Sequence, residues 1–178
     1  MRPGPPALDA VRLIPAAVSG TVGPAWIDAN GHLTLTAHLM AAGDGVERMQ
    51  DDVGVHEAYR RDRSLGMFVA EQRADFVAEL HAGDRYSTHV RVLARSSRAV
   101  HCVSYLVDDT RGRVATVAEY LLLHVDLRTR RAVGIPADVR AGLDRWIASS
   151  EALGWASDTG RALVLRDREH PPGDVPAR

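Results

Sequence analysis

The pattern of apolar positions predicts one long helix followed by a series of strands. From residue 35 onward, apolar side chains recur at steps of three and four, the period of one face of an α-helix about five turns long. Gly43 and Gly45 interrupt this helix and cost about 1 kcal/mol each relative to Ala, so we expect a sheet to approach it closely. Gly54 is the expected helix end. The apolar helical positions are Leu35, Leu39, Ala42, Val46, Met49 and Val53.

The second half of the chain alternates between apolar and polar residues with a period of two, which is typical of strands. Short turns (HAGD, RSSR and DDTRGR) separate the alternating segments, and consecutive strands joined in this way form an antiparallel meander. We expect strands at 17–26, 66–80, 85–94, 99–108 and 114–127, and a final amphipathic helix at 137–148.

This order of elements predicts an α+β fold. A single long helix is best buried when a curved antiparallel sheet wraps around it. Such a sheet has an open edge that favours pairing with a second copy, so we expect a homodimer or a dimer of dimers. The domain should span residues 17–150, with a loose N-terminal arm at 1–16 and a C-terminal extension at 151–178 that ends in a frayed tail.

Composition narrows the possible partners and location. The 178 residues include 22 Lys and Arg against 23 Asp and Glu, a net charge of −1, which argues against a nucleic-acid partner. The single cysteine, Cys102, cannot form an intrachain disulfide. No segment reaches the ~20 apolar residues of a membrane helix or resembles a secretory signal. We therefore expect a cytoplasmic protein.

The segment before the long helix carries the most concentrated chemistry. It contains Asp28, Asn30, Gly31 and His32. A helix N-terminus offers unpaired amides and a partial positive charge, which suit the oxyanion formed when a thioester carbonyl is attacked. Asp28 would attack that carbonyl or deprotonate a water. The alternative is structural: Asp28 or Asn30 caps the helix, and Gly31 permits a tight turn.

Residues 24–33 (PAWIDANGHL) resemble the signature of the 4-hydroxybenzoyl-CoA thioesterase-like hotdog family, in which Asp, two variable residues, Gly-His and an aliphatic residue follow one another. Asp28, Gly31, His32 and Leu33 fill those positions. The Trp-Ile-Asp-x-Asn-Gly-His form of the loop is similar to that of betainyl-CoA thioesterase-like proteins. Further matches are FVAE at 68–71, AGD at 82–84 and LLHVD at 122–126, so the resemblance covers about residues 18–148.

The resemblance implies a hotdog fold and hydrolysis of an acyl-CoA thioester to a free acid and CoA, without a separate cofactor. It implies that Asp28 is the catalytic carboxylate, that Asn30 and His32 hold the loop, and that amides near Gly31, Leu33 and Leu35 polarise the carbonyl. His32 itself is an alternative carbonyl-polarising group.

The chain departs from the family pattern at several positions. Thr34 stands where Asn is common and His38 where Tyr is common, and Gly43 and Asp44 replace a frequent aromatic-acid pair. The resemblance places Thr34 and His38 in or beside the acyl pocket, so it leaves the acyl group open. A quaternary ammonium group would need an aromatic cage, and few of the nine aromatic residues lie near the loop.

Other side chains are candidates for the same pocket or for binding CoA. Glu47 and Glu71 are pocket candidates. The structural alternative for Glu47 is a solvated helix face, and that for Glu71 is an ion pair with Arg73 or with an arginine on a neighbouring strand. Arginine binds phosphate well, so Arg95 and Arg98 are candidates for the CoA nucleotide, as is the cluster of Arg128, Arg130 and Arg131. Ordinary surface charge is the alternative for each arginine.

Several other kinds of function are less well supported. The eight histidines form no zinc motif, so we expect no metal, and no serine sits in a nucleophile elbow. A hotdog enoyl-CoA hydratase would place its His five residues after the Asp, whereas His32 is four after Asp28. A non-catalytic acyl-CoA-binding protein is the third possibility.

Overall fold

The computed structural model describes residues 5–155 and residue 163. Its longest helix, α2 (Leu35–Asp52), lies where the apolar period predicts it. Thr34 caps this helix, because its Oγ1 accepts a hydrogen bond from the amide of Ala37 at 3.2 Å. The structural alternative in which Asp28 or Asn30 caps the helix is therefore wrong. The chain leaves α2 through Gly54, whose φ of +94° suits glycine.

The five strands form one antiparallel sheet in the order β1-β3-β4-β5-β2. The predicted meander is confirmed by the pairing of β3 with β4 and of β4 with β5. The two remaining strands lie at the edges: β2 pairs with β5, and β1 pairs with the first part of β3. The bounds are β1 (Ala16–Thr21), β2 (Leu65–Phe76), β3 (Arg85–Arg95), β4 (Ala99–Asp108) and β5 (Arg113–Asp126).

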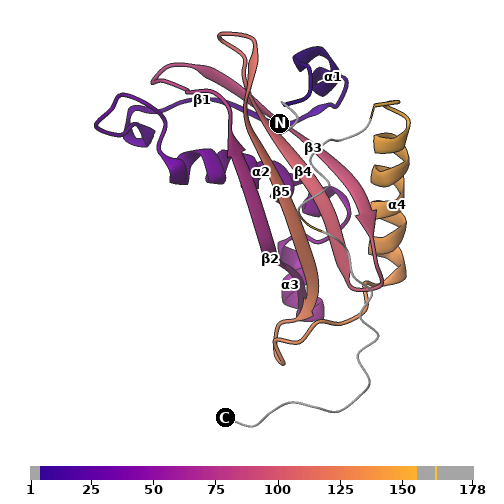
Figure 1. Cartoon of the computed structure of the whole chain (residues 1–178). Helices are drawn as coiled ribbons and strands as arrows, with labels where there is room; N and C mark the ends of the chain where they lie inside the picture. Colours follow the sequence, from indigo (N-terminus) through magenta and orange to yellow (C-terminus); the bar gives the residue numbers. More distant parts are fainter. Residues whose placement is uncertain (1–4, 156–162, 164–178) are drawn as a thin grey trace.

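The sheet packs tightly against α2 (Figure 1). Gly45 explains how this is possible, because a Cβ there would overlap the Thr88 side chain and lie 3.1 Å from Val90 Cγ2. The expected close approach is thus confirmed at Gly45, whereas a Cβ at Gly43 would meet no heavy atom within 4 Å. The Thr88 hydroxyl donates to the carbonyl of Ala41 at 3.0 Å, which also ties helix to sheet.

The first turn of α2 differs from the expectation. Leu35, predicted on the buried face, is 61% exposed, and Ala37 and His38 are buried instead. The buried stripe then follows the predicted positions Ala42, Val46 and Met49. The start of α2 therefore presents Leu35 to the surface and a histidine to the core.

The final helix, α4 (Ala137–Glu151), confirms the prediction for 137–148. It runs alongside β3 (Figure 1). Arg95 of β3 binds Asp144 of α4 through two hydrogen bonds of 2.6 and 2.7 Å. Gly142 allows close approach to the end of α2, since a Cβ there would lie 3.0 Å from Cβ of Val53, the residue that follows the helix.

Two short helices lie outside the predicted set. A helix α1 (Leu8–Arg12) forms within the expected loose arm, and its Val11 and the following Ile14 are buried against β4 and β5. The prediction of a loose arm is therefore wrong for residues 8–14. Helix α3 (Glu57–Arg63) packs beside the start of β2. Most of the expected extension at 151–178 lies outside the described residues.

Smaller differences concern the ends of elements. The expected strand at 17–26 is shorter, and the 3-10 helix η1 (Pro24–Trp26) follows it. Strand β2 ends at Phe76 rather than at residue 80. Cys102 is buried, and burial raises the pKa of its thiol to about 12. Within the described part of the chain, no helix combines the length and apolar character needed to cross a membrane.

Candidate active site

The loop between η1 and α2 is a closed turn built from its own main chain. Ile27 and Leu33 form an isolated antiparallel bridge. Inside it, the amide of Asp28 donates to the carbonyl of His32 at 2.9 Å, and Gly31 adopts a φ of +84°. The tight-turn role predicted for Gly31 is confirmed. The turn holds Asp28 and His32 close together at the start of α2.

The Asp28 carboxylate is bound by the same loop. Its Oδ1 accepts hydrogen bonds from the amides of Asn30 (2.8 Å) and His32 (3.2 Å). Its Oδ2 is 3.3 Å from the side-chain amide of Asn30. These bonds, that from His32 first, lower the pKa of Asp28 below its usual value of 3.8. The side chain is exposed and ionised at neutral pH.

His38 is the second polar group at the start of α2. It is buried, with Nδ1 2.7 Å from Oγ1 of Thr116 on β5. Its ring meets that of Phe76 edge to face, with 5.4 Å between the ring centres. Burial lowers the pKa of His38, so the imidazole is neutral at pH 7.

A pocket of about 410 Å³ brings these groups together. Four of the predicted site residues besides Asp28 line it. The far wall comes from the end of β2 and the segment that follows. The lining residues are Asp28, His32, Leu33, Leu35, His38, Phe76, Val77, Ala78 and Glu79.

The predicted amide donors are only partly available. The amide of Gly31 donates to Asp28 O at 3.1 Å, and that of Leu33 donates to Leu80 O at 2.7 Å. The amide of Leu35, and that of Thr36 after it, belong to the first turn of α2, where a helix supplies no acceptor. Of the three predicted donors, Leu35 is therefore the one that the helix leaves without an acceptor.

The two additional acids lie elsewhere. Glu47 is on the solvated face of α2, 4.0 Å from Arg60, in agreement with its structural alternative. Glu71 is exposed on β2 and does not line the Asp28 pocket of this chain. Its expected partner Arg73 pairs with Asp75 instead, at 3.1 Å.

Neither arginine cluster lies at the Asp28 pocket of the same chain. Arg95 is engaged by Asp144, and Arg98 is in the turn after β3. Arg128 and Arg130 follow β5, and the guanidinium of Arg130 lies 5.0 Å from the ring centre of Phe68. Both clusters are at the ends of strands opposite to the Asp28 loop.

Sequence reasoning missed three residues at the pocket rim: Phe76, Glu79 and His81. Phe76 ends β2 and contacts His38. Glu79 Oε2 is 3.3 Å from His32 Nε2. The His81 ring meets that of His32 edge to face, with 5.3 Å between centres. The sequence shows only that Phe76 ends a strand and that Glu79 and His81 follow it. It does not show that these residues lie beside the Asp28 loop.

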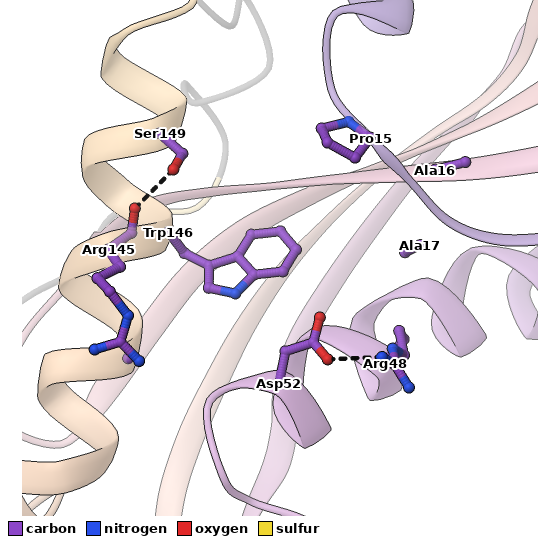
Figure 2. Close-up of a pocket in the computed structure, with 9 residues that line it drawn as sticks. Pro15, Ala16, Ala17, Arg48, Asp52, Arg145, Trp146 and Ser149 are labelled. Carbon is purple, nitrogen blue, oxygen red and sulfur yellow. Dashed lines mark hydrogen bonds and ion pairs between the residues drawn. The ribbon is translucent and has the colours of Figure 1, made fainter.

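A second cavity, of about 590 Å³, lies between the start of β1, α2 and α4 (Figure 2). The Trp146 indole extends into it, and Arg48 pairs with Asp52 at 3.0 Å on the opposite side. The Ser149 hydroxyl is bound to the carbonyl of Arg145 at 3.0 Å. This cavity is larger than the Asp28 pocket, but its serine is engaged and its carboxylate neutralised, so the Asp28 pocket is the better candidate for chemistry.

Comparison with known proteins identifies the family of the chain. Residues 22–143 match the thioesterase-like superfamily. An L-carnitine dehydrogenase/betainyl-CoA thioesterase of Rhizobium meliloti is 29% identical over 126 residues, covering 71% of this chain and 25% of that protein. The chain thus spans about a quarter of that relative's length. A betainyl-CoA thioesterase of Pseudomonas aeruginosa is 24% identical, over 80% of this chain and 89% of its own.

Comparison with solved structures finds proteins with the same fold. A Staphylococcus aureus protein solved in complex with CoA superimposes with a TM-score of 0.75 at 19% identity, over 84% of this chain and 94% of its own. The hotdog architecture expected from the Asp28 loop is confirmed. The chain belongs to the thioesterase-like superfamily.

Proposed function

We propose that this protein is an acyl-CoA thioesterase, which hydrolyses a thioester to a free acid and CoA. The observation that carries the proposal is the ionised Asp28 carboxylate at a pocket beside the start of α2. Superfamily membership and the betainyl-CoA thioesterase relatives support it.

The ionised Asp28 carboxylate can act as a nucleophile or as a general base toward water. The nucleophilic route has two steps. In the proposed first step, a carboxylate oxygen of Asp28 attacks the thioester carbonyl carbon. The C–S bond breaks, CoA leaves as a thiolate and takes a proton from solvent, and a mixed anhydride remains on Asp28. Water then hydrolyses the anhydride, releases the acid and restores the carboxylate.

The start of α2 would stabilise the intermediate. The amides of Leu35 and Thr36 have no helical acceptor and lie at the positive end of the helix dipole. Negative charge developing on the carbonyl oxygen is favoured at such a position. Catalysis in this scheme uses no metal and no cofactor.

Exposed apolar side chains support a homodimer. Strand β2 is an edge of the sheet, and it exposes Phe68 and Val69 near its start and Phe76 at its end. Leu35 and Met40 extend this apolar surface onto α2. Antiparallel pairing of two β2 strands would cover these side chains and place adjacent helices at the interface.

The same pairing offers a binding site for CoA. In an antiparallel pair, the start of one β2 lies beside the end of the other. Arg130, which covers Phe68 near the start of β2, would approach the Asp28 pocket of the partner subunit. Because Arg95 is engaged by Asp144, Arg130 and its neighbours are the better candidates for the CoA phosphates.

The pocket limits the acyl group. Phe76 is its only Phe, Tyr or Trp among the lining residues, and the wall beside it is formed by Leu35, Val77 and Ala78. One phenyl ring does not make the aromatic cage that binds a quaternary ammonium. The apolar part of this wall suits a small apolar acyl chain, and in the proposed dimer the partner subunit would complete the pocket.

A thiol-release screen tests the proposal. Purified protein is assayed with short, branched, aromatic, long-chain and betainyl CoA esters, with and without a chelator. We expect CoA release from at least one ester, unaffected by the chelator. Hydration of an enoyl-CoA without release from any ester would overturn the proposal. A cytoplasmic location, where acyl-CoA substrates occur, is part of the proposal and is tested by cell fractionation.

A further inference from the structure

Two segments that are far apart in the sequence meet at the rim of the Asp28 pocket. The amide of Leu33 donates to the carbonyl of Leu80 at 2.7 Å, and this bond joins the Asp28 loop to the segment after β2. Leu33 and Leu80 are both buried, so the junction is anchored in the core. His32 precedes Leu33, whereas Glu79 and His81 flank Leu80. Their side chains are thereby brought together.

These three side chains form a compact set of possible ligands. His32 Nε2 and Glu79 Oε2 are 3.3 Å apart. His32, Glu79 and His81 each offer one ligand atom, and the three atoms lie within 4.8 Å of one another. Among the residues that the structure describes, no other group of histidine, cysteine or acidic side chains meets this condition.

Asp84 orients His81 within the set. Its Oδ2 accepts the main-chain amide of His81 at 2.7 Å and lies 3.6 Å from His81 Nδ1. Asp84 is buried and is itself bound by Arg111. The bond to the main-chain amide fixes the segment that carries His81, and the Asp84 carboxylate lies close to its ring. A carboxylate beside a metal-binding histidine is a usual arrangement at protein metal sites.

We propose that His32, Glu79 and His81 bind a divalent transition-metal ion, with Zn²⁺ as the best fit. Two imidazoles and one carboxylate are a ligand set that suits zinc, whereas Mg²⁺ and Ca²⁺ favour oxygen ligands alone. The negative charges of Glu79 and the nearby Asp28 favour a bound cation. Three protein ligands leave a further coordination position for water. The site adjoins the Asp28 pocket, since His32 and Glu79 also line that pocket, but the proposed hydrolysis needs no metal.

The test is a direct binding measurement without substrate. Protein free of any affinity tag and treated with chelator, then dialysed, is titrated with Zn²⁺ by calorimetry and with Co²⁺ by visible absorption. We expect one ion per chain and Co²⁺ bands typical of a site with nitrogen and oxygen ligands. Glu79→Gln and His81→Ala should each weaken Zn²⁺ binding by at least ~10-fold.

Two matched variants serve as controls. Glu47→Gln removes an exposed acid on α2, and His56→Asn replaces a histidine outside the set with another capping residue. Both should bind Zn²⁺ as the original chain does. Circular dichroism checks folding, and if His81→Ala is unfolded, Glu79→Gln decides, because Glu79 is exposed.

Absence of Zn²⁺ binding by the folded protein would overturn the proposal, as would equal binding by Glu79→Gln. Because no thioester is present in these measurements, a failure here is distinct from a failure of the proposed thioesterase activity.

Discussion

The imidazole of His38 and the hydroxyl of Thr116 meet inside the protein, with Nδ1 and Oγ1 2.7 Å apart. This contact ties the first turn of α2 to β5. It also means that a titratable side chain is enclosed at the point where the pocket adjoins the core.

Acid should destabilise the protein through His38. Burial lowers its pKa below 6.5, so the unfolded chain binds a proton more readily than the folded one. Its contribution to stability is complete above pH 6.5 and is lost as the pH falls through the folded pKa. The thermal midpoint should therefore drop as the pH falls from about 7 through the folded pKa of His38, and His38→Gln should reduce this drop. An unchanged drop would contradict the prediction. His124, whose pKa is also lowered by burial, accounts for a remaining part.

Replacing Asp28 with Asn tests the catalytic assignment. Asn retains an oxygen that can accept the amides of Asn30 and His32, so the loop and the melting temperature should change little. The charge and the nucleophile are lost, so kcat should fall at least ~10²-fold. Glu71→Gln and Glu47→Gln are the matched controls and should have milder effects. If kcat falls further in Glu71→Gln than in Asp28→Asn, the catalytic carboxylate is Glu71 on β2.

Strand β2 should mediate dimerisation. Val69 is 54% exposed on this edge, and a charge there would be buried on pairing. Light scattering should give twice 19.3 kDa for the original chain and a shift toward the monomer for Val69→Lys. Leu13→Lys is the control, because Leu13 is 63% exposed and far from β2 in the sequence. A monomeric original chain at working concentration would refute the prediction.

Arg130 should bind the nucleotide part of CoA. Arg130→Gln is expected to raise KM for an acyl-CoA about 10-fold, the effect of about 1.4 kcal/mol, with little change in kcat. An acyl-pantetheine, which lacks the nucleotide, should show no such difference. Arg95→Gln should instead lower stability, since it removes the bonds to Asp144. If only Arg95→Gln raises KM, the CoA phosphates bind at Arg95 and Arg98 and not at Arg130.

The two glycines of α2 should respond in opposite ways to alanine. Gly45→Ala forces a Cβ into Thr88 and should destabilise the protein by about 1–3 kcal/mol. Gly43→Ala meets open space and should stabilise it by about 0.5–1 kcal/mol. Urea unfolding of both variants measures the difference. Equal effects would mean that the helix can shift away from β3.

Much of the fold could be predicted because the buried positions of a helix or strand recur with its period, and apolar residues occupy them. The steps of three and four located α2, and alternation located β3, β4 and β5. Leu35 was misplaced because the first turn of α2 buries Ala37 and the polar His38 instead, so the apolar period does not match the buried positions there. Helix α1 was missed because Val11 and Ile14 are too few to show a period, although tertiary contacts bury them.

The site was predictable only where its residues are consecutive. Asp28, Gly31 and His32 form one turn, so a short sequence motif is enough to predict that they lie together. Glu79 and His81 join them through the bond between Leu33 and Leu80, which no local pattern contains. Thr34 was taken as a pocket residue, whereas its hydroxyl is engaged in capping α2.

The two edges of the sheet are unequal. Strand β1 has six residues and a register shift, and α4 covers β3 beyond it, whereas β2 offers twelve residues. Short, irregular or covered edges are poor templates for strand addition. The sheet of a second copy can pair at β2, and the hydrogen-bonding groups of both β2 edges are then occupied. In the proposed dimer, growth along the hydrogen-bonding direction would therefore stop at a pair, and the chains would not extend into a fibre.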